Sequence, residues 1–181
     1  RAIPNPDLKS ETSEGVELGI RRIGRSSSLS LTLFNTDYDD FIESRVLIGV
    51  DPETGDLIFQ SRNIDKARIY GLDIRYDQDL SAWRDSLQGC LLNFAGYWAE
   101  GENRQTDQPL NSIAPPQGVL GLSWISAGGH WDVAANGTFT ASKGESDIDQ
   151  TDGERFGAPS WSILDFTVGW RPGGRLDLRA G

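Results

Sequence analysis

The residue types that most often carry out chemistry are few in this chain. His130 is the single histidine, and an imidazole can ligate an iron or pass a proton near neutral pH. It stands directly after Gly128-Gly129, a pair that is typical of a tight turn. We therefore expect His130 to be a solvated or interfacial side chain.

The acidic run Asp147-Ile-Asp149-Gln-Thr-Asp152-Gly153 has the spacing nearest to a metal-binding motif. Calcium loops of the EF-hand type place their carboxylates at alternate positions. In this run the third aspartate comes one position too late for that pattern. The run therefore predicts a solvated acidic loop.

The sequence offers little for enzyme catalysis. With one histidine and no Gly-x-Ser-x-Gly turn, serine hydrolase chemistry has few groups to use. Asp73, Arg75 and Asp77 alternate along one segment and could be read as acid–base groups. Their period of two instead places them in a row on one face of a strand, so we expect no covalent chemistry from this chain.

The segment that carries these charges indicates how the whole chain is organised. From Tyr70 to Asp77, apolar or aromatic residues alternate with glycine and charged residues, which predicts a β-strand with two different faces. In a soluble sandwich the charged face would meet water, whereas in an outer-membrane barrel the apolar face meets lipid and the charged face lines the lumen. The tyrosines at both ends of the apolar row favour the barrel, because tyrosine rings gather at membrane interfaces.

Similar alternation predicts strands along the rest of the chain. The connections between them alternate between short turns and long polar loops, and the long ones cover residues 43–62, 100–117 and 142–158. An extended entry segment, residues 1–13, comes first. The predicted strands cover residues 14–23, 28–38, 64–77, 87–99, 118–124, 131–141, 160–170 and 176–181.

This asymmetry of the connections is typical of transmembrane β-barrels, which have tight periplasmic turns and long extracellular loops. Strands of about ten residues also suit a tilted crossing of the bilayer. The sequence therefore predicts an all-β fold, an antiparallel transmembrane β-barrel segment of about eight strands from a larger plugged barrel. The alternative is a soluble β-sandwich binding module, whose turns would come at more regular intervals.

Net charge and cysteine content exclude two further classes of protein. The net charge is −10, and most of the excess acid falls in the long loops, which suits an exposed surface. A chain with this charge is not expected to bind nucleic acid. Cys90 is the only cysteine, so no disulfide framework is expected.

Several segments resemble one protein family. Asn5-Pro-Asp-Leu-Lys-Ser-Glu-Thr-Ser13 is similar to the Asn-Pro-[Asn/Asp]-Leu-Lys-Pro-Glu-Thr segment of TonB-dependent outer-membrane receptors, with Ser10 in place of the usual proline. Other segments resemble the branch of haem and haemoglobin receptors, which also includes transferrin and lactoferrin receptors. These segments are Phe34-Asn-Thr-Asp-Tyr-Asp-Asp-Phe-Ile42, Asn63-Ile-Asp-Lys-Ala-Arg-Ile-Tyr-Gly-Leu72, Pro109-Leu-Asn-Ser-Ile-Ala-Pro-Pro116 and Trp161-Ser-Ile-Leu-Asp165.

The resemblance implies that residues 1–181 are the C-terminal part of a receptor barrel whose complete form has about 22 strands around a plug domain. Of the family's haem box, only the downstream Asn-Pro-[Asn/Asp]-Leu is present. It maps onto Asn5, Pro6, Asp7 and Leu8, which are the ligand-binding residues that the resemblance predicts. The axial histidine, the plug and the TonB box would lie before Arg1, and the closing strand would lie after Gly181.

The implied function is uptake of haem or a haem protein across the outer membrane of a Gram-negative bacterium. Haem would be a transported ligand and no cofactor would be bound covalently. The TonB–ExbB–ExbD complex would act through the plug, the loops would contact extracellular haem or its carrier protein, and the apolar rows would contact membrane lipid. The alternatives are a ferric-siderophore receptor of the same family, an outer-membrane barrel enzyme, or the soluble sandwich.

Overall fold

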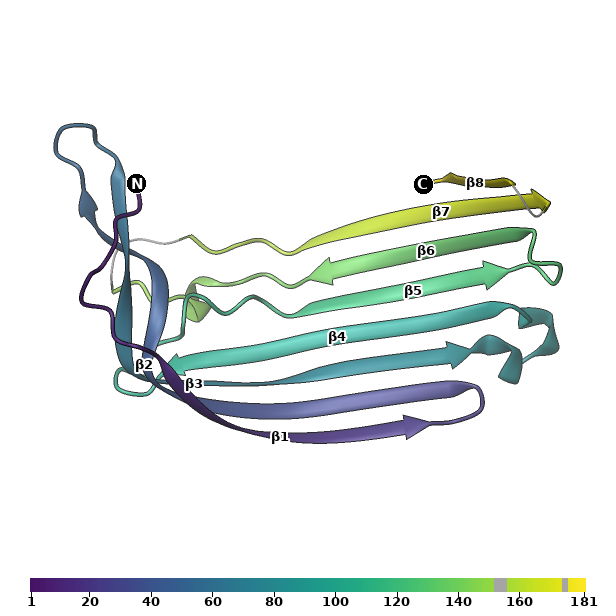
Figure 1. The fold of residues 1–181 in the computed structure, drawn as a ribbon, viewed down its shortest axis with the longest axis horizontal. Coiled ribbons are helices and arrows are strands. Elements are labelled where there is room, and N and C mark those ends of the chain that lie inside the picture. Colours follow the sequence, from purple (N-terminus) through teal and green to yellow (C-terminus); the bar gives the residue numbers. More distant parts are fainter. Residues whose placement is uncertain (152–155, 174–175) are drawn as a thin grey trace.

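A computed structural model describes residues 1–151, 156–173 and 176–181. Within these residues the chain forms one antiparallel sheet of eight strands, and each strand pairs with its neighbours in sequence (Figure 1). This confirms the predicted all-β fold with about eight antiparallel strands. The strands are β1 (Thr12–Ile23), β2 (Ser27–Val50), β3 (Leu57–Asp79), β4 (Cys90–Asn103), β5 (Gln117–Ile125), β6 (Trp131–Thr140), β7 (Trp161–Gly173) and β8 (Leu176–Ala180).

The register of the strands brings the apolar rows together on one face of the sheet. Residues directly opposite each other in antiparallel strands share a face. Leu72 of β3 lies opposite Leu33 of β2 and opposite Trp98 of β4, and similar pairs continue to β7. We call this the apolar face; across the sheet it includes Leu18, Leu33, Leu72, Leu92, Leu122, Ala135 and Phe166.

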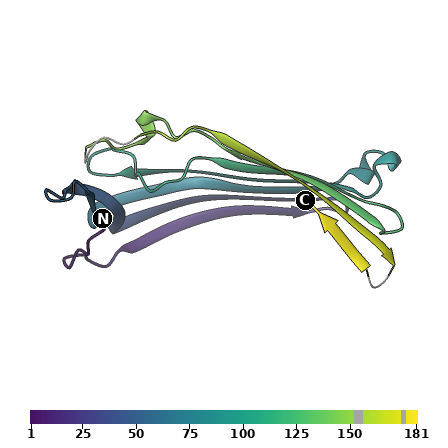
Figure 2. The ribbon, with the colours of Figure 1, turned by 90° about the horizontal axis from the view of Figure 1, so that it is seen from above.

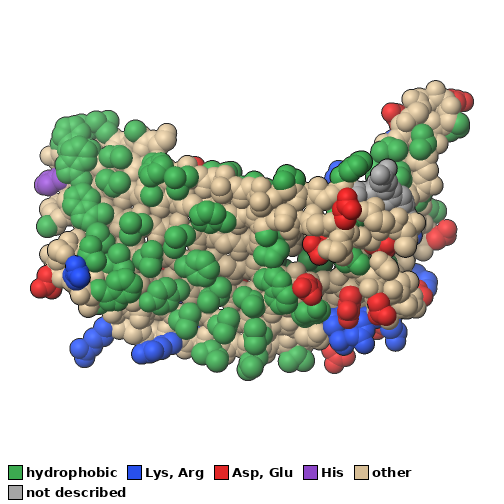
Figure 3. Space-filling view, turned by 180° about the vertical axis from the view of Figure 1, so that it is seen from behind, with side chains coloured by type: hydrophobic (Ala, Val, Ile, Leu, Met, Phe, Trp, Pro, Cys, Tyr) green, Lys and Arg blue, Asp and Glu red, His purple; other side chains and the backbone are tan. Residues whose placement is uncertain are grey.

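The apolar face has charged side chains only near its two ends (Figure 3). Aromatic pairs also lie near both ends: Trp131 and Trp170 stack at 5.7 Å, and Tyr70 and Trp98 meet edge-to-face at 5.9 Å between ring centroids. An apolar band between two aromatic rows is the arrangement that membrane barrels present to lipid. The prediction that the apolar row between Tyr70 and Tyr76 faces lipid thus applies to the whole sheet.

The opposite face, which we call the polar face, carries the small and charged residues. The Arg75 guanidinium lies 3.5 Å from the Asp73 carboxylate, and the Ser28 hydroxyl donates to Asp77 at 2.9 Å. The charged groups of Asp73, Arg75 and Asp77 are therefore paired with each other or with a hydroxyl on the same face. A Cβ on Gly71 would collide with the Phe34 ring and with the Trp98 carbonyl, so only glycine fits beneath that ring.

The sheet is a single layer and has no core between its faces. It curves without β1 and β8 pairing among the residues described (Figure 2). A small core forms instead where the long connections meet, which we call the loop end; the short turns lie at the turn end. The buried residues of this core are Phe41, Ile64, Ala67 and Leu110, with Tyr38, Ile69 and Ile113 packed against them.

The prediction of a long loop at residues 43–62 is wrong, because most of these residues form a β-hairpin. β2 continues to Val50 and β3 begins at Leu57, so only the turn at residues 51–56 connects them. We call residues 43–62 the projecting hairpin, because it bends away from the sheet at the loop end (Figure 1). The alternation of apolar and polar residues that marks a strand is interrupted in this segment. Asp40 and Arg45 have left-handed backbone, with φ angles of 52° and 59°, and the register shifts after Glu43 and Leu47.

The other connections follow the predicted rhythm with shifted boundaries. The short turn expected between the predicted strands 64–77 and 87–99 lies at 80–89 and contains two 3₁₀ turns, Leu80–Ala82 and Asp85–Leu87. A third 3₁₀ turn, Glu145–Asp147, lies in the connection between β6 and β7. In the expected turn at 171–175, residues 171–173 belong to β7, and 174–175 lie outside the described residues.

Among the described residues, no helix is long and apolar enough to cross a membrane.

Candidate functional site

The predicted ligand-binding residues lie in the entry segment, which runs beside the projecting hairpin and ends at residue 11, because β1 begins at Thr12. The Ile3 N–H donates to the Phe59 carbonyl at 2.9 Å, and the Phe59 N–H donates to the Arg1 carbonyl at 2.8 Å. These bonds form a short parallel pairing on the edge of β3 that does not face β2. The entry segment therefore extends the sheet at the loop end.

Asn5 holds this arrangement together. Its side-chain amide donates to the Ser61 carbonyl at 2.9 Å, and its side-chain oxygen accepts from the Asp7 N–H at 3.0 Å. Asn5 and Leu8 are half-buried, whereas Pro6 and Asp7 are exposed. The contacts of Asn5 fix the backbone of residues 5–8 on the projecting hairpin, and their role toward a ligand stays a prediction.

The bend of β2 is held by the end of the entry segment. Glu11 accepts a hydrogen bond from the Ile42 N–H at 2.7 Å. The Asn63 amide donates to the Asp40 carbonyl at 2.6 Å and to the Lys9 carbonyl at 3.1 Å. These bonds satisfy backbone groups that leave the regular ladder, as buried or strained backbone requires.

Asn111 joins three loop-end segments. Its backbone N–H donates to the carboxylate of Glu43 at 3.2 Å, and the Glu43 residue is only 4% exposed. Its side chain bonds both the N–H and the carbonyl of Asp149, at 2.9 and 3.1 Å. The projecting hairpin, residues 104–116 and residues 141–160 are therefore connected through one residue.

Lys143 strengthens the same connection. Its ammonium donates to the carbonyl of Asn111 at 3.0 Å and to that of Ile113 at 2.6 Å. Hydrogen bonds from a charged donor are stronger than neutral ones. The loop end is consequently a packed and hydrogen-bonded assembly, with Leu110 only 2% exposed at its centre.

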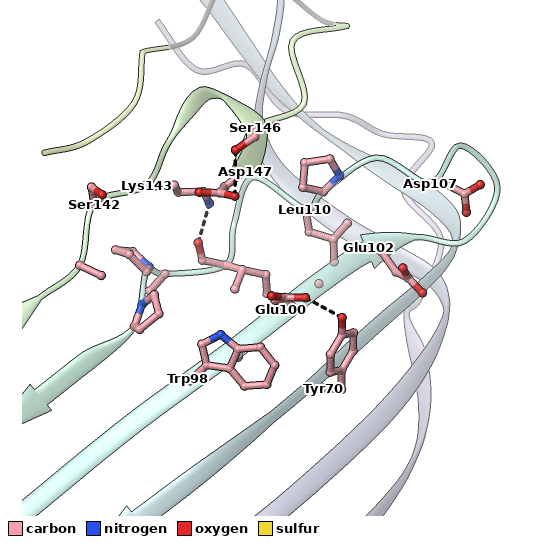
Figure 4. Close-up of a pocket in the computed structure, with 18 residues that line it drawn as sticks. Tyr70, Trp98, Glu100, Glu102, Asp107, Leu110, Ser142, Lys143, Ser146 and Asp147 are labelled. Carbon is pink, nitrogen blue, oxygen red and sulfur yellow. Dashed lines mark hydrogen bonds between the residues drawn. The ribbon is translucent and has the colours of Figure 1, made fainter. Parts of the chain in front are cut away.

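A cavity of about 460 Å³ opens between the end of β4 and these loops (Figure 4). β5 pairs with β4 only as far as Tyr97 and Gln117, whereas β4 continues to Asn103. Residues 109–116 and 141–147 cover the space left beside the last residues of β4. The cavity thus exists because the two neighbouring strands differ in length.

The floor of the cavity is aromatic and its rim is acidic. Trp98 and Tyr70 lie side by side, and the Tyr70 hydroxyl donates to Glu100 at 2.6 Å (Figure 4). The carboxylates that line it belong to Glu100, Glu102, Asp107 and Asp147, and Lys143 is the basic residue of the lining. Arg104 is paired with Glu102 at 3.3 Å, so acidic groups exceed basic groups along the rim.

A further ion pair lies beyond the aromatic row, on the part of β2 and β3 nearest the loops. The Arg68 guanidinium contacts Asp37 at 2.8 Å. The hydrogen bond from Arg68 lowers the pKa of the Asp37 carboxyl below its ordinary value of 3.8. Asp37 is therefore ionised at neutral pH.

The other candidate groups have structural contacts. His130 is exposed at the turn end, and its Nδ1 lies 2.8 Å from the Arg171 carbonyl. Asp147 accepts from the Gly144 N–H at 2.9 Å, and Asp149 accepts from the Thr151 N–H at 2.9 Å. Both carboxylates therefore cap local turns, and Asp152 and Gly153 of the acidic run lie outside the described residues.

The family of the chain follows from its match to a family model. The model for "TonB dependent receptor-like, beta-barrel" matches residues 1–181. The chain belongs to this TonB-dependent receptor β-barrel family. Barrels of the family lie in the outer membrane of Gram-negative bacteria, where an apolar face of the barrel wall meets lipid.

Curated relatives of this TonB-dependent receptor barrel have names that refer to haemoglobin and haptoglobin. It is 29% identical to the "Hemoglobin and hemoglobin-haptoglobin-binding protein" of Haemophilus ducreyi, over 98% of this chain and 21% of that protein. It is 27% identical to the "Hemoglobin-haptoglobin utilization protein B" of Neisseria meningitidis serogroup C, over 79% of this chain and 20% of that protein. The chain thus spans about a fifth of the length of these relatives.

Solved structures show the same fold. The TonB-dependent receptor barrel superposes on "Copper transporter OprC" with a TM-score of 0.75 and 18% identity, over 96% of this chain and 25% of that one. It superposes on the siderophore receptor PirA from Acinetobacter baumannii with a TM-score of 0.66 and 22% identity, over 97% of this chain and 27% of that one. These likenesses concern the architecture of the barrel wall alone.

Proposed function

We propose that residues 1–181 form the C-terminal part of the barrel of an outer-membrane receptor that takes up haem from a haem protein. The observation that carries this proposal is the 29% identity over 98% of the chain to a haemoglobin and haemoglobin-haptoglobin-binding protein. A second relative with a haemoglobin-haptoglobin name covers 79% of the chain. The haem carrier, and not free haem, is the partner that these names support.

The shape of the loop end supports a protein partner. The projecting hairpin extends beyond the membrane band and presents Val50 and Leu57, which lie opposite each other and are 56% and 49% exposed. Apolar side chains exposed to water in a contiguous group mark protein contact surfaces. The hydrogen bonds of Asn111 and Lys143 hold the neighbouring loops in place, which reduces the entropy lost on binding.

The remaining parts of the proposal are supported by membership of the family. Haem is the transported ligand, no covalent step occurs in this chain, and the TonB–ExbB–ExbD complex supplies energy through the plug. Asn5, Pro6, Asp7 and Leu8 lie against the projecting hairpin, where a carrier protein that contacts the hairpin would reach the exposed Pro6 and Asp7. Uptake of a ferric siderophore has less support, because the siderophore receptors resemble this chain at the level of the fold.

The test uses the complete receptor in the outer membrane of a host without its own haem receptors. Residues 48–58 are replaced by Asn-Gly, a two-residue turn that joins the facing residues Leu47 and Phe59. We expect the unaltered receptor to bind haemoglobin and to support growth on haemoglobin iron, and we expect the shortened hairpin to weaken binding by roughly tenfold or more. Growth on a ferric siderophore without haemoglobin binding would overturn the proposal.

A further inference from the structure

The cavity at the end of β4 lies in the middle of the described sheet. Its walls come from β3, β4 and the connections that flank β5 and β6, whereas the unpaired edges of the sheet are β1 and β8. Strands added at either edge would therefore leave this cavity unchanged. It is a built feature of the wall and is independent of the carrier-binding role proposed for the projecting hairpin.

The size and lining of the cavity indicate the kind of molecule that fits. A volume of about 460 Å³ lies within the range of small-molecule sites. The apolar part of the lining includes Leu110, Ile113 and Pro115. A compact apolar body, such as an aromatic ring or a short alkyl group, would be covered by these side chains and by the Trp98 ring.

The electrostatics of the cavity select a cation. Of the four carboxylates that line it, Glu102 is paired with Arg104 at 3.3 Å, which leaves three carboxylates against one ammonium. That ammonium, on Lys143, already donates to the carbonyls of Asn111 and Ile113. Aromatic faces attract cations through their quadrupole, and tryptophan does so best. Glu100 lies beside this aromatic floor, held by the Tyr70 hydroxyl at 2.6 Å. The two propionates of haem would be repelled by the same groups.

We propose that this cavity binds an ammonium group carried on a compact apolar body, with the cation between Trp98 and Glu100. The Tyr70 hydroxyl keeps the Glu100 carboxylate beside the ring, and Leu110 and Ile113 cover the apolar part. Because Tyr70 and Trp98 belong to the aromatic row at the membrane surface, the ammonium group has two sources. It is either the head group of an outer-leaflet lipid or a soluble amine from the medium.

The first experiment titrates the complete receptor in detergent with phenethylammonium chloride and measures binding by calorimetry. We expect saturable binding that phenylacetate, the anion of similar shape, does not show. Glu100→Gln, which keeps a hydrogen-bond acceptor for Tyr70, should weaken binding by roughly three- to thirtyfold. Asp85→Asn, at the turn end of the sheet, is the matched control and should bind like the unaltered receptor.

Two further measurements make the outcome decisive. Trp98→Leu should weaken binding as much as Glu100→Gln, and the heat-modifiability of each variant on a gel shows whether its barrel has assembled. In nanodiscs, added phosphatidylethanolamine should compete with phenethylammonium if the lipid is the source, and should not compete if the source is a soluble amine. Equal binding of phenethylammonium and phenylacetate, or full binding by assembled Glu100→Gln receptor, would overturn the proposal.

Discussion

The buried carboxylate of Glu43 and the backbone N–H of Asn111 meet at 3.2 Å, although 68 residues separate them in the sequence. Glu43 also faces Arg62 across the projecting hairpin. A buried carboxylate is tolerated only where hydrogen bonds and charges compensate its lost hydration. This contact therefore ties the base of the hairpin to the loop that contains Leu110.

Removing this carboxylate should loosen the loop end. In Glu43→Ala the Asn111 N–H loses its acceptor inside the protein, and leaving a buried donor unsatisfied costs roughly 1–3 kcal/mol. We expect faster hydrogen exchange in residues 104–116 of the complete receptor. Glu43→Gln keeps an acceptor and should show a smaller change, whereas equal exchange in Glu43→Ala and the unaltered receptor would contradict this role.

The two faces of the sheet should respond differently to polar substitutions. Leu72 and Leu122 lie on the apolar face, where an arginine costs roughly 2–4 kcal/mol at the lipid midplane and less near the aromatic rows. Leu72 lies opposite Trp98 and should therefore show the smaller effect of the two. Leu72→Arg and Leu122→Arg should therefore reduce the amount of heat-modifiable barrel on a gel. Asp73→Asn and Thr138→Ala on the polar face should assemble almost normally. Equal loss from both sets would show that the faces are assigned wrongly.

Gly71 should be far less tolerant of a side chain than Gly19. A Cβ at Gly71 would collide with the Trp98 carbonyl and the Phe34 ring, whereas the nearest atom to a Cβ at Gly19 would be 3.8 Å away. Both glycines are on the polar face, in β1 and β3, the two strands that flank β2. We expect Gly71→Ala to destabilise the folded barrel by roughly 1–3 kcal/mol, measured by urea unfolding in detergent, and Gly19→Ala to have little effect. A similar urea midpoint for the two variants would contradict the steric argument.

Residues 1–181 expressed alone should aggregate. The single-layer sheet has no core between its faces, and β1 and β8 leave strand edges that lipid cannot satisfy. Small residues of the polar face, such as Gly19 and Thr138, would leave a narrow closed barrel underfilled. A monomeric, heat-modifiable band from this polypeptide in detergent, with β-rich circular dichroism, would show that it closes into a barrel by itself.

Much of the wall of the barrel can be predicted from the sequence, because strand periodicity is a local signal. Leu72 and Asp73 fall on the faces that their alternation predicts, and the short turn after Ile23 connects β1 to β2 as expected. The projecting hairpin could not be predicted in the same way. The left-handed backbone at Asp40 and Arg45 interrupts the alternation, so its residues have the pattern of a loop.

The candidate sites depend on contacts between residues that are far apart in sequence. Neither the pairing of Glu43 with Asn111 nor the cavity beside Trp98 has a local pattern, since each arises where loops fold back on strand ends. The segment Pro109 to Pro116 was noted only for its resemblance to a receptor family. Its sequence did not predict that Leu110 would be buried in the loop-end core. The predicted residues Asn5 to Leu8 were found beside the projecting hairpin, in contact with β3.

The small core at the loop end has a consequence for how the sequence of the loops can vary. Leu110, Phe41 and Ile64 stabilise the loops from within, whereas the turn at residues 51–56 at the tip of the hairpin contributes nothing to that core. Substitutions at the tip are therefore expected to leave the loops beneath it undisturbed. Residues 104–116 tolerate change less freely than the tip, because Leu110 is part of the core that holds the loops together.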